Sequence, residues 1–120
     1  MPSDTYIALA LALEGRSPLA CRYGGHPRVI CPIILGHREA EEMALVFQIA
    51  GRTSRGPLRE AQWKCLRVAG ITDLALADAA WSSGRAHSEP QHCVTTVDYD
   101  VNPASPYVPR CSLGDLRKAG

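Results

Sequence analysis

The chain has 120 residues, of which 46% are hydrophobic and 21% charged, a composition typical of one folded domain and not of a disordered segment. Its 13 basic residues nearly balance 12 acidic ones, and the net charge of +1 excludes a general attraction to nucleic acid or to anionic membranes. No apolar run approaches the roughly 20 residues that cross a bilayer, and no secretory signal is seen, so we expect a cytoplasmic protein without a membrane partner.

The first predicted element is a helix over residues 3–14. Ser3 is a favourable N-cap, Asp4 complements the positive end of a helix, and the alanines and leucines that follow favour helix formation. Gly15 is a natural stop signal. The apolar residues also alternate with alanines, which leaves a strand as the alternative.

The next segment predicts a β-hairpin. Pro18–Tyr23 and Arg28–Leu35 are rich in strand-forming residues, and the glycines, histidine and proline at 24–27 are turn residues. Pro32 cannot donate a backbone hydrogen bond, so it marks an edge position or a bulge in the second strand. The charged segment 36–42 is expected to end that strand.

Three further strands follow. Met43–Ala50 alternates between two faces, Trp63–Val68 comes after a glycine- and arginine-rich loop at 51–62, and Ile71–Leu76 continues beyond a kink at Gly70.

The following segment is less regular. Asp78–Trp81 predicts a single helical turn and 82–91 a polar loop. Cys93–Val101 alternates as a half-exposed strand, in which Asp98 and Asp100 belong to a polar outer face.

One helix followed by five or six short strands with tight turns predicts a mainly β domain that curls into a small barrel. Such closure also protects strand edges. We expect one domain over 1–101, with the helix at 3–14, the barrel at 18–76 and an additional strand at 93–101. The Pro-rich segment 102–120 predicts a flexible tail.

Cysteines and histidines give no metal signature. Five widely spaced cysteines occur without a CxxC pair, which predicts free, mostly buried thiols in a reducing compartment. Cys21 and Cys31 fall on opposite faces of the predicted hairpin, so we do not expect them to pair. His87 and His92 flank Glu89, but this spacing matches no compact metal motif, and we predict no metal site.

Several residues of the predicted strands occur in the same order along the chain as in one known family. The residues concerned are Gly15-Arg16, Pro18-Leu19, Tyr23, Arg28, Pro32, Leu35, Gly36 and Trp63–Ile71. In this order, residues 5–76 resemble WYL domains, small Sm-like (SH3-type) barrels found beside bacterial transcription regulators and in defence systems. Ala44-Leu45-Val46 replaces the name-giving Trp-Tyr-Leu tripeptide, and Ala69-Gly70 replaces an Asp-Arg pair before the closing Ile71.

The resemblance implies a five- to six-stranded Sm-like barrel that acts as a regulatory or ligand-sensing module. Local basic and aromatic residues suit an anionic ligand, because guanidinium groups grip phosphate and an aromatic face stacks a base. We therefore predict that a nucleotide or a short single-stranded nucleic acid is bound by Tyr23, Arg28, Trp63, Lys64 and Arg67, without a cofactor.

Other interpretations stay open. The arginines at 52–59 also fit a solvated loop, and Trp63 also fits a core position. In a second hypothesis the chain is a protein-interaction or self-association module, since small barrels associate through strand edges. Its partner is then a regulatory protein or a second copy of the chain. No GxSxG, HExxH or phosphate-loop motif occurs, and we predict no enzyme activity.

Overall fold

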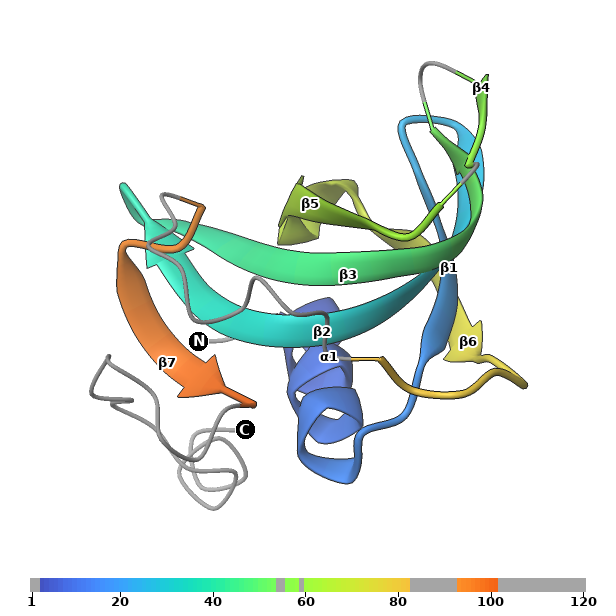
Figure 1. The fold of residues 1–120 in the computed structure, drawn as a ribbon. Coiled ribbons are helices and arrows are strands. Elements are labelled where there is room, and N and C mark those ends of the chain that lie inside the picture. The colour runs from blue at the N-terminus through green and yellow to red at the C-terminus, as the bar shows by residue number, and fades with distance from the viewer. Residues whose placement is uncertain (1–2, 54–55, 59, 83–92, 102–120) are drawn as a thin grey trace.

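The computed structural model of the chain is mainly β, with one N-terminal helix and a curled antiparallel sheet that forms a half-barrel (Figure 1). It describes residues 3–53, 56–58, 60–82 and 93–101. The elements in chain order are α1 (Asp4–Gly15), β1 (Leu19–Tyr23), β2 (His26–Arg38), β3 (Glu41–Thr53), β4 (Gly56–Pro57), β5 (Gln62–Arg67), the 3₁₀ turn η1 (Val68–Gly70), β6 (Thr72–Leu76) and β7 (Thr96–Asp100). The predicted fold class is confirmed.

Helix α1 begins at the predicted cap. The Ser3 hydroxyl accepts a hydrogen bond from the Tyr6 backbone N–H (3.1 Å), which satisfies one of the free donors in the first turn. Arg16 ends the helix in a left-handed conformation (φ 49°), and its N–H bonds to the Leu13 carbonyl (3.2 Å). The strand alternative for this segment is wrong.

Strand β2 is the centre of the sheet. The strand order is β4-β3-β2-β1-β6, while β5 pairs with β3 and β7 pairs with β2. Within the described part of the chain, β5 pairs only with β3, and β6 only with β1. These two strands are therefore the free edges of the curl, and η1 joins them (Figure 1).

Both β2 and β3 are longer than the sequence predicted. The charged segment 36–42 does not end β2; the strand continues to Arg38, turns at Glu39–Ala40 and returns at once as β3. The register between the two strands shifts between Pro32 and Ile34, which confirms the bulge predicted from Pro32.

Three other expectations are corrected. The predicted loop at 51–62 contains the end of β3 and the short strand β4. Asp78–Trp81 forms bends and no helical turn. The strand predicted at 93–101 is formed at Thr96–Asp100, while the predicted tail, 102–120, lies outside the described residues.

The core is mainly aliphatic, with Tyr6 and Tyr99 as its buried aromatic residues. Helix α1 packs against β2 and contributes Leu9 and Leu13, while the middle of β2 contributes Ile30, Ile33 and Ile34. Among the described residues no helix has the length and apolar character to cross a membrane.

Gly36 provides the first test of this packing. A Cβ atom at this position would collide with the Thr96 carbonyl of β7 and press on Val94. We expect Gly36→Ala to lower the free energy of unfolding by about 3 kcal/mol, measured by urea denaturation, because backbone atoms cannot yield as a side chain does. Gly15→Ala is the matched control, since its Cβ meets only Ser17 Oγ at 3.5 Å. Equal stability of the two variants would contradict the close approach of β7 to β2.

Candidate anion-binding site at the hairpin end

Arg28, one of the five predicted ligand residues, is buried in a polar network at the start of β2. Only 7% of its surface is exposed. Its Nε donates to the Tyr23 carbonyl (3.3 Å), its Nη1 donates to Oε1 of Gln48 (3.1 Å), and its Cζ lies 5.3 Å from the centre of the Tyr23 ring. Among the described residues no carboxylate pairs with Arg28, so neutral groups alone hold this buried positive charge.

The turn between β1 and β2 lies beside one corner of the buried Arg28 guanidinium. Gly24 and Gly25 have positive φ angles (60° and 79°), which glycine adopts without steric cost and which a two-residue hairpin requires. The Nη2 atom of Arg28 has no hydrogen-bond partner within the described ranges, and a Cβ on Gly24 would lie 3.9 Å from it. A Cβ on Gly25 would meet nothing within 4 Å, so the turn backbone can be approached closely.

Two more arginines border this turn. Arg22 is exposed and donates from Nη2 to the Gly25 carbonyl (2.8 Å), and exposed Arg52 follows Gly51, the residue that pairs with Arg28 across β2 and β3. We define Arg22, Arg28, Arg52 and the turn Gly24–Gly25 as the hairpin-end site.

The strands that form the hairpin-end site carry no acidic residue close to it in the sequence. The sequence has no acidic residue from 15 to 38 or from 43 to 59. Asp73 of β6 follows Thr72, which pairs with Arg22, but no ion pair joins Asp73 to Arg22 in the part of the chain that the structure describes. A cationic site therefore forms on a chain whose net charge is only +1.

Gln48 fixes the geometry of this end of the sheet. It is fully buried, accepts from Arg28, and donates from Nε2 to the carbonyls of Ala50 and Arg52 (3.1 Å each). Sequence reasoning missed both Gln48 and Arg22 as site residues. The one available signal was that Gln48 shares a predicted strand face with Val46, which placed a polar side chain on the buried side of β3.

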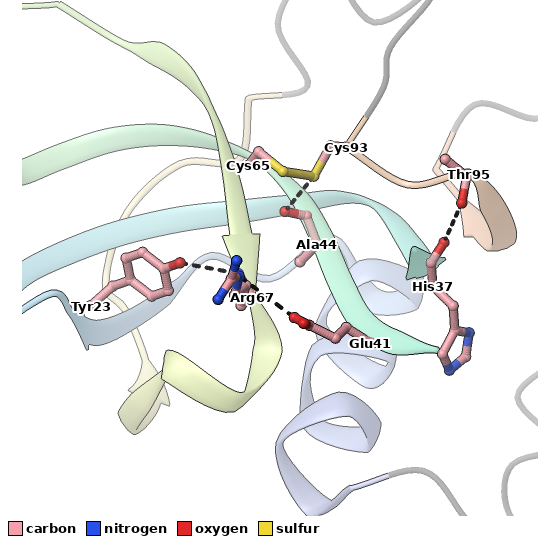
Figure 2. The surroundings of a disulfide bond; sticks show 8 residues. All are labelled: Tyr23, His37, Glu41, Ala44, Cys65, Arg67, Cys93 and Thr95. Atoms are coloured by element: carbon pink, nitrogen blue, oxygen red, sulfur yellow. Dashed lines mark hydrogen bonds and ion pairs between the residues drawn. A yellow bond between two sulfur atoms is a disulfide. The ribbon is translucent and has the colours of Figure 1, made fainter. Parts of the chain in front are cut away.

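Arg67 is joined to the same region through its backbone. Its N–H donates to the Tyr23 hydroxyl (3.1 Å; Figure 2). Tyr23 therefore contacts both predicted arginines, since its ring also lies beside the Arg28 guanidinium. The Arg67 side chain is 65% exposed, and its Nε lies 3.5 Å from Oε2 of Glu41, which is 57% exposed. A pair this exposed contributes little to stability and leaves the guanidinium available to a ligand.

Trp63 and Lys64 lie apart from the other three predicted residues. The Trp63 ring packs on Phe47, with ring centres 5.1 Å apart, and the two residues are paired across β5 and β3. Lys64 pairs with Val46 and is half-buried. The structure thus joins Tyr23 to both Arg28 and Arg67.

Burial controls the chemistry of Cys21, which is paired with Arg28 across the hairpin. Loss of solvent raises the pKa of this thiol from 9.0 to about 11, and the nearby positive charge of Arg28 opposes that rise. Burial also raises the pKa of Cys31, against which the Ser82 backbone N–H acts. Both thiols are free, so Cys21 and Cys31 form no bridge, as predicted. A turn at Gly25-His26 would have paired Cys21 with Ile30, whereas the structure pairs it with Arg28.

The expectation of free cysteines is wrong for another pair. Cys65 of β5 and Cys93, just before β7, form a disulfide (Figure 2). Their sequence separation is 28, and a loop of that size is stabilised by about 3.5 kcal/mol through its effect on the unfolded chain. Wide spacing in the sequence hid this contact, and Cys111 lies outside the described residues.

Asp98 was assigned to a polar outer face and is instead buried. Its Oδ2 accepts from the Tyr6 hydroxyl (2.6 Å) and lies 3.1 Å from Nδ1 of His37, whose side chain is 39% exposed. The Tyr6 and His37 rings stack with centres 5.8 Å apart. This cluster joins α1, β2 and β7 at the opposite end of β2 from Arg28.

The comparisons with known proteins add no relative. No family model, no curated protein and no solved structure matches this chain.

The network around Arg28 can be tested by a double-mutant cycle. Gln48→Leu leaves a buried charged donor unpaired, and Arg28→Met leaves buried acceptors unpaired, so we expect each to lower the free energy of unfolding by about 2–4 kcal/mol. The double variant should cost less than the sum of the two, with a coupling of about 1–3 kcal/mol in urea denaturation. Arg22→Met, an exposed control, should stay within about 0.5 kcal/mol of the parent. Additive single costs would refute the network.

Cys21 predicts a loss of stability at alkaline pH. The unfolded thiol ionises near 9.0 and the folded one near about 11, so the unfolded chain alone loses the proton between these values. Stability from this group is complete below pH 9 and falls by about 2–3 kcal/mol as the pH rises to 11. Thermal unfolding from pH 8 to pH 11 should show a shallower decline for Cys21→Ala. Identical slopes for the parent and this variant would exclude the effect.

Proposed function

We propose that this chain is a non-catalytic, ligand-sensing regulatory module that binds a phosphate-bearing ligand at the hairpin-end site. The ligand class is a nucleotide or a short single-stranded nucleic acid. Two features support a regulatory role: the small β fold and the order of residues that resembles WYL domains. In this role, binding of the ligand would change how the chain interacts with a protein partner.

The observation that carries the proposal is the uncompensated charge of Arg28. Moving a cation out of water costs several kcal/mol unless an anion or a full set of acceptors replaces the lost hydration. The Tyr23 carbonyl accepts from Nε, Oε1 of Gln48 accepts from Nη1, and the Tyr23 ring lies against the plane of the guanidinium. Among the described residues no acceptor bonds to the N–H groups of Nη2. A phosphate oxygen at Nη2 would complete the set with a charge-assisted hydrogen bond.

The surroundings of Nη2 suit such a ligand. The Gly24–Gly25 turn presents backbone without side chains, the Arg22 guanidinium lies at the Gly25 carbonyl, and exposed Arg52 follows the residue paired with Arg28. Arg67 and Tyr23 extend the cationic and aromatic surface toward β5. We retain Lys64 and Trp63 as contacts only for a ligand long enough to follow β5, such as a single strand of several nucleotides.

A second candidate function is self-association, and the free edge of β6 favours it. Leu76 on this strand is 78% exposed. Beside it, an apolar groove of about 330 Å³ runs between α1 and β6, lined by Leu11, Leu19, Leu74 and Leu76 with alanines and one serine. An unpaired edge next to an apolar groove is a template for pairing with another strand.

Binding and its electrostatics can be measured by fluorescence anisotropy with a labelled oligothymidylate, and with nucleotides as competitors. We expect Arg22→Ala and Arg52→Ala each to weaken binding about tenfold, the equivalent of one charge-assisted contact of about 1.5 kcal/mol. Affinity should also fall as salt is raised. Arg38→Ala is the control, because it removes the same charge at the far end of β2.

An equal loss in Arg38→Ala, or no binding by the parent chain, would overturn the anion-binding proposal. Light scattering on the parent and on Leu76→Lys then tests the second candidate. Association that this substitution abolishes, while oligonucleotide binding is unchanged, assigns the β6 edge to self-association and leaves the hairpin-end site to the ligand.

The location of the chain bears on both candidates. We propose that the protein is cytoplasmic. In that compartment the Cys65–Cys93 disulfide would be exposed to reducing thiols. Stable structural disulfides belong to oxidising compartments, whereas cytosolic disulfides are usually transient, catalytic or redox-sensing.

A further inference from the structure

The Cys65–Cys93 disulfide is asymmetric in its exposure. Cys65 lies on exposed edge strand β5, whereas Cys93 is 6% exposed and its sulfur lies 3.5 Å from the Ala44 carbonyl (Figure 2). Thiol–disulfide exchange requires a thiolate to reach one of the two sulfurs. Burial blocks approach to Cys93, so an incoming thiol meets Cys65.

Two basic residues, Lys64 and Arg67, lie close to Cys65 along β5. Side chains two residues apart on a strand share a face, which places Arg67 and Trp63 on either side of Cys65 along β5. Arg67 is largely exposed, and Lys64 is the neighbour of Cys65 in the chain. Within the described residues, the acid that forms an ion pair with this strand is Glu41 of β3, whose Oε2 lies 3.5 Å from Arg67 Nε. An anionic thiol is therefore attracted more strongly than an uncharged one.

We propose that Cys65 is a reversible thiol-exchange site, at which a small anionic thiol of the glutathione class forms a mixed disulfide and releases Cys93. The attacking thiolate forms a new S–S bond with Cys65 while the Cys65–Cys93 bond breaks, so the number of disulfides is unchanged. The Cys93 sulfur leaves with the electron pair and takes a proton from water. A second thiol then releases Cys65 as a thiol and is itself oxidised to the disulfide of the small thiol.

The released Cys93 has a partner already in place. Its S–H, once formed, faces the Ala44 carbonyl at the distance of a sulfur hydrogen bond. The disulfide joins β5, which pairs with β3 alone as far as the structure describes the chain, to the segment just before β7. Exchange therefore removes a covalent link between two segments that no strand pairing joins in the described residues.

No other described cysteine competes for this chemistry. Cys21 and Cys31 are buried in the sheet and free, and burial keeps both as protonated thiols near neutral pH. A mixed disulfide on the described residues is consequently confined to one position.

The experiment is intact-mass spectrometry of the oxidised full chain after timed exposure to reduced glutathione and acid quenching. We expect one glutathione adduct to appear in the parent and in Cys93→Ser treated with glutathione disulfide, and none in Cys65→Ser under the same treatment. Cys111→Ser is included to assign any adduct outside the described residues. The thermal midpoint of the parent should fall when the disulfide opens, as loss of a loop constraint requires.

Charge selectivity separates this site from an ordinary structural disulfide. Arg67→Ala should slow the reaction with glutathione several-fold and leave the reaction with uncharged 2-mercaptoethanol unchanged, whereas Arg38→Ala should change neither. Three results would each overturn the proposal: a disulfide that survives glutathione until the chain is unfolded, adducts that form as readily in Cys65→Ser, or an Arg67→Ala effect that is equal for both thiols. Oligonucleotide binding takes no part in this readout, so the exchange site and the anion-binding proposal fail independently.

Discussion

The structure depends on the length and bending of β2. This strand has 13 residues and pairs with β1 along its first part, with β3 along nearly all of it, and with β7 along its last part. A straight strand cannot serve three partners around a small core. The register shifts after Val29 and after Pro32 supply the bends, and Pro32 has no N–H to lose at such a position. Gly36 then allows β7 to lie against the strand where any Cβ would clash.

The same strand separates two buried polar networks. Arg28 lies near its beginning and His37 near its end, a span of about 30 Å for an unbent strand. Arg28 ties β1, β2 and β3 together through Tyr23 and Gln48, while the Asp98 carboxylate ties α1 and β7 to His37. Each network carries one charge sign at one end of the sheet, so a nearly neutral chain presents a cationic end to a ligand.

Local signals in the sequence predicted most elements and the contacts between neighbours in the chain. The Ser3 cap, a tight turn within residues 24–27 and the alternation in β3 each depend on a few consecutive residues, and each appears in the structure, although the turn is at Gly24–Gly25 and His26 already belongs to β2. The prediction failed where a residue meets a distant partner. Asp98 fits an exposed position by alternation, but the Tyr6 hydroxyl from α1 and the His37 ring from β2 give its buried side chain polar partners.

The candidate site also contains both kinds of contact, those between neighbours in the chain and those between distant strands. Tyr23 and Arg28 belong to one hairpin, so their proximity could be predicted, while Gln48 and the Cys65–Cys93 bond depend on how β3, β5 and β7 are arranged in space. Arg28 itself is more deeply buried than a ligand-binding strand arginine was expected to be. The sequence argument was that an exposed arginine attracts an anionic ligand. The structure supports a different argument, in which a buried positive charge without a carboxylate partner is stabilised when an anion binds.

A continuous set of contacts connects the two proposed sites. Cys65 is two residues from Arg67, the Arg67 N–H bonds to the Tyr23 hydroxyl, and the Tyr23 ring faces the Arg28 guanidinium. Contacts alone do not establish coupling between two sites. Coupling requires an element that has two arrangements, and binding or reaction at each site must shift the equilibrium between them. The disulfide supplies two such states of β5, tethered to the segment before β7 or released from it. If release moves β5 enough to change the position of Tyr23, then linkage requires that a ligand on Arg28 shifts thiol exchange at Cys65 by the same factor.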